Sequence, residues 1–274
     1  MDQLAPFIRP FVAILVGMTL VMLVAWVTQR AVKNGGWVDV FWTFGTGLAC
    51  VVAAMWPGET ANGGRQLLVA ALAAVWALRL GVYVAVRVAG SSEDARYASF
   101  RKEWGANFQR NMFLLIFPQG PASALLAMSV FAAAHGGGPD IGLRDTLGAL
   151  VLLIAIVGEG FADEQMRRFK AEGHHGAIMD RGMWGWSRHP NYFFEWVGWL
   201  AYPVIAFDPS QPWTWATLIA PVIMFIVLRF GTGVPALEKN MLESRGDRFR
   251  DYQSRVSAFF PLPPRKRNSA EQHS

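Results

Sequence analysis

The chain has 274 residues, of which 53% are hydrophobic and only 16% are charged, whereas soluble domains carry about 25% charged residues. This composition excludes a disordered chain, which would be polar and rich in charge. It also argues against a single soluble domain, whose core would be too small to bury so much apolar surface. The formal net charge of +5 then raises the question of where a hydrophobic protein places its charges.

Seven stretches meet or approach the roughly 20 apolar residues that a helix needs to cross a bilayer. In chain order they are residues 11–27, 37–56, 66–86, 112–134, 146–162, 192–207 and 213–230. The fourth contains Pro118 and Pro121, so we expect a kink there, and six spans remain an alternative if this stretch is re-entrant. The sequence predicts an all-α fold, a polytopic membrane bundle of seven transmembrane helices, with residues 1–264 as one domain and 265–274 as a disordered basic tail.

Basic residues are distributed unevenly among the segments that join these spans. Nineteen of the 25 Lys and Arg residues lie in segments 28–36, 88–111, 164–190 and 231–274, whereas the alternate segments hold three. This bias follows the positive-inside rule, and it predicts an outside N-terminus and a cytoplasmic C-terminus. The basic excess is therefore assigned to membrane topology, and no nucleic-acid partner is expected.

Polar side chains inside the predicted spans are costly in a bilayer, so each one requires a partner or a function. Asp39 lies near the start of the second span, where it is either a simple N-terminal helix charge or a functional acid. In the third span, Arg79 and Arg87 share a helix face with Tyr83. Arg87 can extend to the membrane edge, whereas the deeper Arg79 predicts a bound anion or a buried carboxylate.

Four charged residues follow one helix face at the end of the fifth span. They are Glu159, Asp163, Arg167 and Lys170, at spacings of four, four and three residues. They form either a ladder of intrahelical ion pairs, each contributing roughly 0.2–0.5 kcal/mol, or a binding surface. A ladder alone would not require Glu159 inside an apolar span, so both interpretations stay open.

A second polar group follows in the connection to the sixth span. Pro190 favours an extended residue before it and a helix after it, which gathers Arg188, Asn191 and Glu195 about a helix N-terminus. Such a terminus attracts anions, and amide and carboxylate groups recognise ribose and amide groups. The set therefore favours a phosphate-bearing nucleotide as ligand. The sequence contains no HExxH or similar metal-ligand spacing, so no metal centre is expected.

Residues 187–196, with the sequence SRHPNYFFEW, closely resemble the signature of bacterial membrane proteins related to steroid 5α-reductases. Further marks of this resemblance are VDVFW at 38–42, WALRLG at 76–81, DARY at 94–97 and GVPALE at 233–238. The resemblance implies a multi-pass protein of the bacterial inner membrane. It also implies NADPH-dependent reduction of an activated carbon–carbon double bond in a lipid, typically the 4-ene of a 3-oxo steroid.

The resemblance also implies roles for individual residues. NADPH would be held on the cytoplasmic side by polar residues that match the family's: Arg79, Glu159, Asp163, Arg167, Lys170, Asn191 and Glu195, with Arg188, Tyr192 and Glu238 in addition. An acid in the second span polarises the substrate ketone in that family, and Asp39 is the nearest match. The family's assisting tyrosine matches Trp76 here, which leaves Tyr83 as the nearest hydroxyl. The expected partners are an apolar enone that enters from the bilayer, and membrane lipid.

Two other functions stay open at this point. An Arg-His-Pro motif also occurs in membrane methyltransferases of the isoprenylcysteine or phospholipid type, which use S-adenosylmethionine. The basic residues of the fifth span favour the reductase, because a 2′-phosphate needs cations that S-adenosylmethionine does not. A non-enzymatic lipid-binding or structural membrane protein would explain the 12 tryptophans as interface belts, but not the charges at one helix junction. The oligomeric state is not determined by the sequence.

Overall fold

The computed structural model describes residues 5–58, 62–90, 93–136, 141–174 and 176–265. Within these residues the chain forms α-helices and short 3₁₀ helices and no β-strand, which confirms the expected all-α fold. The chain divides into unit 1, formed by Met1–Leu152 and Trp199–Ile223, and unit 2, formed by Leu153–Gly198 and Met224–Ser274. The predicted disordered tail lies, apart from Arg265, outside the described residues.

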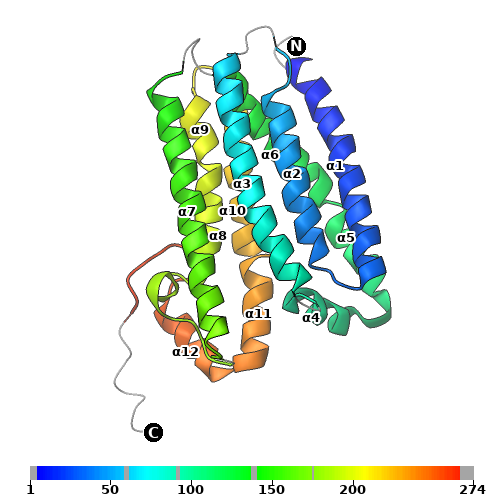
Figure 1. Ribbon diagram of the computed structural model, residues 1–274, viewed down its shortest axis with the longest axis vertical. Helices are drawn as coiled ribbons and strands as arrows, with labels where there is room; N and C mark the ends of the chain where they lie inside the picture. Colours follow the sequence, from blue (N-terminus) through cyan, green and yellow to red (C-terminus); the bar gives the residue numbers. More distant parts are fainter. Residues whose placement is uncertain (1–4, 59–61, 91–92, 137–140, 175, 266–274) are drawn as a thin grey trace. The chain divides into compact units, whose positions relative to one another are not determined.

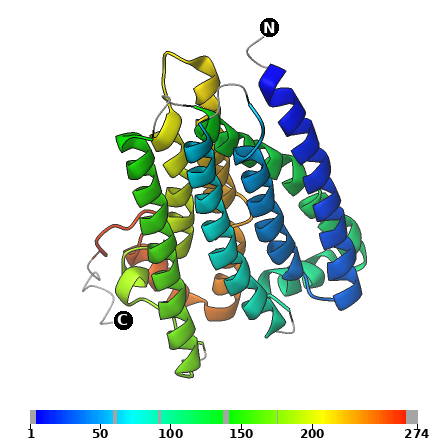
Figure 2. The same ribbon diagram turned by 45° about the horizontal axis from the view of Figure 1, so that its top comes forward.

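Unit 1 is a bundle in which helix α2 (Trp37–Ala54) packs against three others (Figures 1 and 2). Its neighbours are α1 (Ala5–Val32), α3 (Gly63–Ala89) and α6 (Gln119–His135). The closest approach joins α2 to α3 at Gly47, where an added Cβ would lie 2.1 Å from the Cβ of Ala77. Only glycine permits this contact, so Gly47 allows α2 to pack tightly on α3.

The predicted kink in the fourth apolar stretch is confirmed as a break between two helices. Helix α4 (Ala95–Trp104) and the 3₁₀ turn η1 (Gly105–Asn107) lead into α5 (Phe108–Ile116), and α6 begins three residues later. Pro118 lies between α5 and α6 and lacks the N–H that a continuous helix would use.

A buried ion pair joins the N-terminal ends of α3 and α7 (Leu143–Ala171), a helix that contributes to both units. The Nε of Arg65 lies 2.6 Å from Oδ1 of Asp145, and the two side chains are only 4% and 2% exposed. Arg65 also donates to the Gly136 carbonyl at 2.8 Å. The α3 N-terminus is capped by Asn62, whose side chain accepts from the Arg65 N–H at 3.0 Å. These bonds compensate the desolvation of both charges.

The stretch 192–207, predicted as one span, consists of two short helices. Helix α8 (Pro190–Trp199) begins at the proline, as the sequence predicts, and α9 (Ala201–Ala206) follows after Leu200. The break is explained by Pro203, which has no N–H to donate to the Trp199 carbonyl four residues earlier and whose ring would clash with it. A similar interruption separates the 3₁₀ helix η3 (Pro212–Leu218) from α10 (Ile219–Phe230), where Pro221 cannot donate to Thr217.

Unit 2 combines the later part of α7, α8 and the end of α10 with three further elements. These are the 3₁₀ turn η2 (Gly182–Gly185), α11 (Val234–Arg245) and α12 (Asp247–Arg255). Helix α12 buries Phe249 and Tyr252 in a small apolar cluster with Val256. A second cluster is aromatic, with Phe225 of α10 lying against Trp196 of α8 and Phe259 of the C-terminal segment. These contacts hold the C-terminal segment beside the start of α8.

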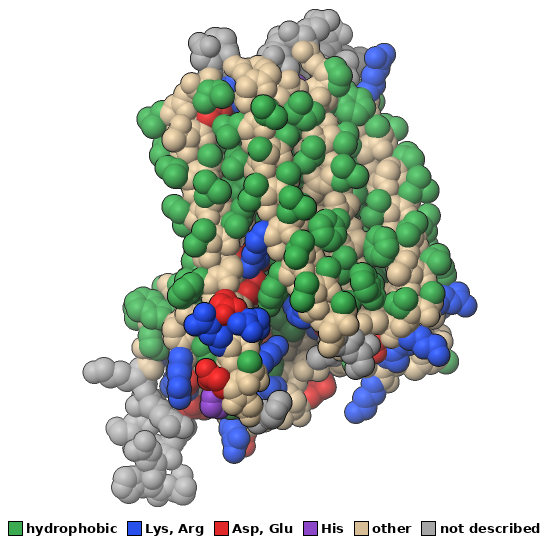
Figure 3. All heavy atoms as spheres, viewed as in Figure 1, with side chains coloured by type: hydrophobic (Ala, Val, Ile, Leu, Met, Phe, Trp, Pro, Cys, Tyr) green, Lys and Arg blue, Asp and Glu red, His purple; other side chains and the backbone are tan. Residues whose placement is uncertain are grey.

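Six helical segments of the described chain are long and apolar enough to cross a membrane. They are Phe7–Val32, Trp37–Ala54, Gly63–Ala89, Arg96–His135, Leu143–Ala171 and Pro212–Arg245. The difference from the predicted seven is the broken segment formed by α8 and α9. Figure 3 shows apolar side chains covering the visible face of α1 to α3, with charged side chains gathered toward one end of these helices. The chain is therefore an integral, multi-pass membrane protein.

Candidate functional site

Asp39, the predicted substrate-polarising acid, lies in the first turn of α2 and is held by two residues of α4. Its carboxylate forms an ion pair with Arg96 and accepts a hydrogen bond from the Tyr97 hydroxyl at 2.9 Å. Tyr97 is buried and the Asp39 side chain is 26% exposed. We call these three residues the Asp39 cluster. The carboxyl group acts in it as a hydrogen-bond acceptor.

The position of Arg96 is set by the start of α4. Asp94 caps this helix, because its side chain accepts from the Arg96 backbone N–H at 3.0 Å and from the Arg96 Nε at 3.1 Å. Burial opposes the ionisation of Asp94, but the neighbouring Arg96 guanidinium and its hydrogen bonds lower the pKa of Asp94 below its ordinary value. The guanidinium is thus fixed between two carboxylates, Asp94 and Asp39.

Tyr83, the other predicted catalytic residue, lies on α3 between the two arginines that the sequence singled out. The guanidinium carbon of Arg79 lies 5.5 Å from the centre of the Tyr83 ring, and that of Arg87 lies 6.0 Å from it. The ring packs against a buried cluster that includes Val40 of α2 and Val84 of α3. The predicted shared face of α3 is confirmed, and Tyr83 occupies a cationic environment.

In unit 2, the predicted polar residues of α7 and α8 meet across an antiparallel helix pair. The Asn191 side chain donates to Oδ1 of Asp163 at 3.3 Å, and the Phe194 ring packs against Gly158. The same register places Glu195 opposite Glu159 one turn further on. Both of these carboxyl groups and Asp163 are buried. We call Glu159, Asp163, Asn191 and Glu195 the α7–α8 cluster; it is rich in acceptors and lies on apolar helices.

The two predicted basic residues of α7 lie beyond this cluster and are exposed. Arg167 pairs with Glu164, donating from Nε and Nη2 at 2.6 and 2.8 Å. Lys170 follows one turn later, near the end of the helix. Both cations are therefore placed where α7 leaves its apolar stretch, within reach of an anion in solvent.

Arg188 and Glu238, predicted as additional cofactor residues, bind each other. The Glu238 carboxylate accepts from Arg188 at 2.7 and 3.1 Å and from the Gln253 amide at 2.7 Å. The His189 ring nitrogen Nε2 lies 3.1 Å from the same carboxylate. We call these four residues the Glu238 network. Burial lowers the pKa of His189, and the hydrogen bond to Glu238 opposes this shift.

Tyr192, another predicted cofactor residue, stacks on the His189 ring with 5.7 Å between ring centroids. The surrounding backbone is held by the C-terminal segment, because the Arg188 N–H donates to the Ser257 carbonyl at 2.8 Å and the Ser187 hydroxyl to the Phe259 carbonyl at 2.8 Å. The start of the signature motif is therefore held by Glu238 of α11 and by the C-terminal segment.

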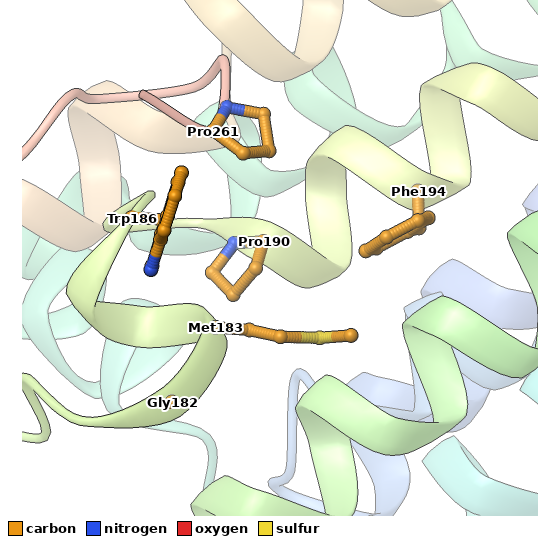
Figure 4. A pocket seen from close by; sticks show the side chains of 6 residues that line it. All are labelled: Gly182, Met183, Trp186, Pro190, Phe194 and Pro261. Atoms are coloured by element: carbon orange, nitrogen blue, oxygen red, sulfur yellow. The ribbon is translucent and has the colours of Figure 1, made fainter. Parts of the chain in front are cut away.

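An apolar pocket of about 400 Å³ lies beside the start of α8 (Figure 4). Its lining consists of six residues without charged groups: Gly182, Met183, Trp186, Pro190, Phe194 and Pro261. Figure 4 shows the Met183 side chain extending toward Phe194, with Trp186 and Pro261 on the other side of Pro190. Gly182, Met183 and Trp186 belong to the segment before α8, and Pro261 belongs to the C-terminal segment. The pocket is therefore formed by the start of α8 and the two segments that pack beside it.

Sequence reasoning missed the partners of the candidate residues more than the residues themselves. Arg96 and Tyr97 belong to the DARY pattern, but nothing in that pattern identifies them as partners of Asp39, which lies 57 and 58 residues earlier in the chain. His189 and Gln253 carry no signal in the sequence that identifies them as partners of Glu238. The available signal was the adjacency of Arg188 and His189, two potential donors beside one another.

Comparison with known proteins assigns the chain to a family. The model of the family described as "Protein of unknown function (DUF1295)" matches residues 25–256 of the chain, a range that contains the Asp39 cluster, the α7–α8 cluster and the Glu238 network. An uncharacterized protein of Schizosaccharomyces pombe, C594.04c, is 24% identical over 282 residues, covering 92% of this chain and 80% of the yeast protein. No solved structure matches the chain.

Proposed function

Because the chain belongs to the DUF1295 family, which contains steroid 5α-reductase-like members, we propose that it is an NADPH-dependent reductase. Its substrate would be a membrane lipid with an activated carbon–carbon double bond, of the type found in the 4-ene of a 3-oxo steroid. The observation that carries the proposal is the α7–α8 cluster: Asn191 bound to Asp163 at 3.3 Å between two apolar helices. Burying polar groups inside a membrane protein is costly, and such groups usually serve binding or catalysis.

The residues of unit 2 fit the chemical groups of NADPH. Buried carboxylates and an amide suit the ribose hydroxyls and the nicotinamide amide, which are hydrogen-bond donors. Arg167 and Lys170, at the exposed end of α7, suit the phosphates. Arg188 and Glu238 satisfy each other, so we assign them the role of positioning the start of α8. When bound, NADPH would supply a hydride to the β-carbon of the enone.

The substrate ketone needs a donor that stabilises the negative charge that develops on its oxygen. Asp39 is an acceptor paired with Arg96, so we assign it a positioning role in the Asp39 cluster. Tyr83 carries a hydroxyl, and Arg79 beside its ring favours negative charge nearby. We therefore propose Tyr83 as the group that donates to the ketone oxygen.

Our topology proposal retains seven crossings, with α8 and α9 together forming one of them. Two contacts place α9 along the first turns of α7: Arg144 donates to the Phe207 carbonyl, and Ile205 packs on Gly148. The contact of Phe194 with Gly158 places α8 along a later part of the same helix. With this crossing, the basic segments would all face the cytoplasm of a bacterial inner membrane. NADPH would then bind from the cytoplasm, and the apolar substrate would enter from the bilayer.

Turnover of a defined enone tests the proposal. Purified protein is incubated with NADPH and progesterone, and the absorbance of NADPH is followed while the reduced steroid is identified by mass spectrometry. We expect reduction that Tyr83→Phe lowers by about 100-fold, in keeping with the loss of one oxyanion donor, with unchanged NADPH affinity. Stabilisation by S-adenosylhomocysteine but not by NADP⁺, without reduction of any enone, would instead indicate a methyltransferase.

A further inference from the structure

The pocket beside α8 has an exposed apolar lining residue, Trp186, outside the candidate membrane-crossing segments. Trp186 is 50% exposed and Leu262 is 55% exposed, and the Leu262 N–H donates to the Trp186 carbonyl at 3.0 Å. Neighbouring large apolar side chains that are exposed outside a membrane span indicate an interaction surface. The pocket volume of about 400 Å³ lies within the range of ligand sites.

The helix α7 lies against one lining residue of the pocket, Phe194. Phe194, which lines the pocket, fits against Gly158, where an added Cβ would lie 2.5 Å from its ring. The residue before this glycine, Val157, and Phe161 one turn later are 69% and 58% exposed. Since α7 is one of the six segments suited to cross a membrane, its exposed apolar residues face lipid. An acyl chain beside α7 therefore has an apolar path to the pocket.

Two arginines flank the segments that form this site. Arg181 directly precedes Gly182, and Arg265 follows Leu262 by three residues. Both are exposed, and within the part of the chain that the structure describes neither guanidinium has an ion pair or a side-chain hydrogen bond. Other arginines of unit 2, such as Arg188 and Arg255, are paired with carboxylates. Exposed guanidinium groups so near in sequence to the residues of an apolar pocket suit a phosphate group.

We propose that this pocket binds one anionic phospholipid of the bilayer, with an acyl chain between Met183 and Phe194 and the phosphate at Arg181 and Arg265. The apolar lining recognises the chain, and the two cations favour an anionic headgroup over a zwitterionic one. The site involves neither the Asp39 cluster nor the α7–α8 cluster, so it is independent of the reductase proposal. The bound lipid would hold residues 182–186 and the C-terminal segment at the membrane surface.

Native mass spectrometry of delipidated protein tests this site. The protein is titrated in detergent with palmitoyl-oleoyl phosphatidylglycerol and, separately, with the matched phosphatidylcholine. We expect one phosphatidylglycerol to bind more tightly than all later ones. Arg181→Gln should weaken this first binding by about fivefold, the effect of one cation near a lipid surface, and leave phosphatidylcholine unchanged. The matched control is Arg248→Gln, an exposed arginine of α12 away from the pocket, which should bind as the wild type does.

The acyl-chain contact is tested by filling the pocket. Met183→Trp should weaken both lipids, because it occupies the space between the Met183 and Phe194 positions. Trp186→Ala removes a half-exposed wall without disturbing the core, and it should also weaken both lipids, so it replaces Met183→Trp if that variant does not fold. Equal effects of Arg181→Gln and Arg248→Gln, or unchanged lipid affinity in the pocket variants, would overturn the proposal.

Discussion

The Asp39 cluster and the Glu238 network are both centred on one carboxylate, but they differ in completeness. Asp39 receives Arg96 and Tyr97 and keeps 26% of its side chain exposed. Glu238 receives donors from Arg188, His189 and Gln253 and is 13% exposed. A carboxylate with all its acceptor sites used holds its neighbours in place, whereas one that is partly exposed still has room to meet another group.

A similar difference distinguishes residues within the signature motif, 187–196. Some of its side chains are fully engaged by the protein, and others have room to bind a ligand. The resemblance implies cofactor contacts for Arg188 and Glu238 as well as for Asn191 and Glu195. Arg188 also donates to the Gln253 carbonyl at 3.2 Å, so its guanidinium is engaged by the protein itself. Among the described residues, the Asn191 side chain makes one long hydrogen bond, to Asp163 at 3.3 Å. We infer that the motif has a supporting half, Arg188 and His189, and a binding half, Asn191 and Glu195.

The largest expected effect of a substitution in this comparison is that of Glu238→Ala. It would leave the Arg188 guanidinium, only 10% exposed, without its carboxylate, and the loss of one partner from a buried ion pair costs about 3–5 kcal/mol. The measurement is the free energy of unfolding in mixed micelles. Glu243→Ala, an exposed residue of the same helix, serves as control, and we expect a change within about 0.5 kcal/mol. Equal costs for the two variants would contradict the supporting role.

A smaller effect is expected for Asp39→Asn. Arg96 keeps Asp94 as a partner, and an asparagine can still accept from Tyr97, so we expect a loss of about 1 kcal/mol. The same unfolding assay measures it, with Tyr97→Phe as a companion variant that removes only the hydroxyl donor. A loss as large as that of Glu238→Ala would show that the two clusters are equally structural.

The smallest effect is a dependence of stability on pH that His189 contributes. Burial lowers its pKa in the folded protein from the ordinary 6.5, so the unfolded chain binds a proton more readily than the folded one. His189 therefore reduces stability as pH falls below about 6.5, and its contribution becomes constant once the pH is below its folded-state pKa. Arg188 and Glu238, its charged neighbours, are kept intact in the test.

Melting temperatures measured in steps between about pH 8 and pH 5 compare the wild type with His189→Gln. The melting temperature of the variant should fall less than that of the wild type as the pH decreases below about 6.5. An identical pH profile would mean that the pKa of His189 is the same in the folded and unfolded states, which would contradict the effect of burial.

The helices could be predicted from the sequence because their signals are local. Residues 37–56 became α2, ending at Ala54, and Pro118 and Pro190 mark a helix break and a helix start as expected. Hydrophobicity alone predicts one helix over 192–207, whereas Pro203 explains why the segment divides into α8 and α9. The pairing of Asp39 with Arg96 and Tyr97, and of Glu238 with Arg188 and His189, joins residues 49 to 58 positions apart, which no local pattern specifies. Candidate residues were thus predictable, and their pairing was not.

The central claim is that NADPH binds at the α7–α8 cluster. Its most direct test is the affinity of the purified protein for NADP⁺ and for S-adenosylhomocysteine, measured by isothermal titration for the wild type, Asn191→Ala and the control Asn107→Ala, an exposed residue of η1. We predict that the wild type and the control bind NADP⁺ equally, that Asn191→Ala binds it about tenfold more weakly, and that S-adenosylhomocysteine does not bind. Equal NADP⁺ affinity in all three proteins, or binding of S-adenosylhomocysteine alone, would contradict it.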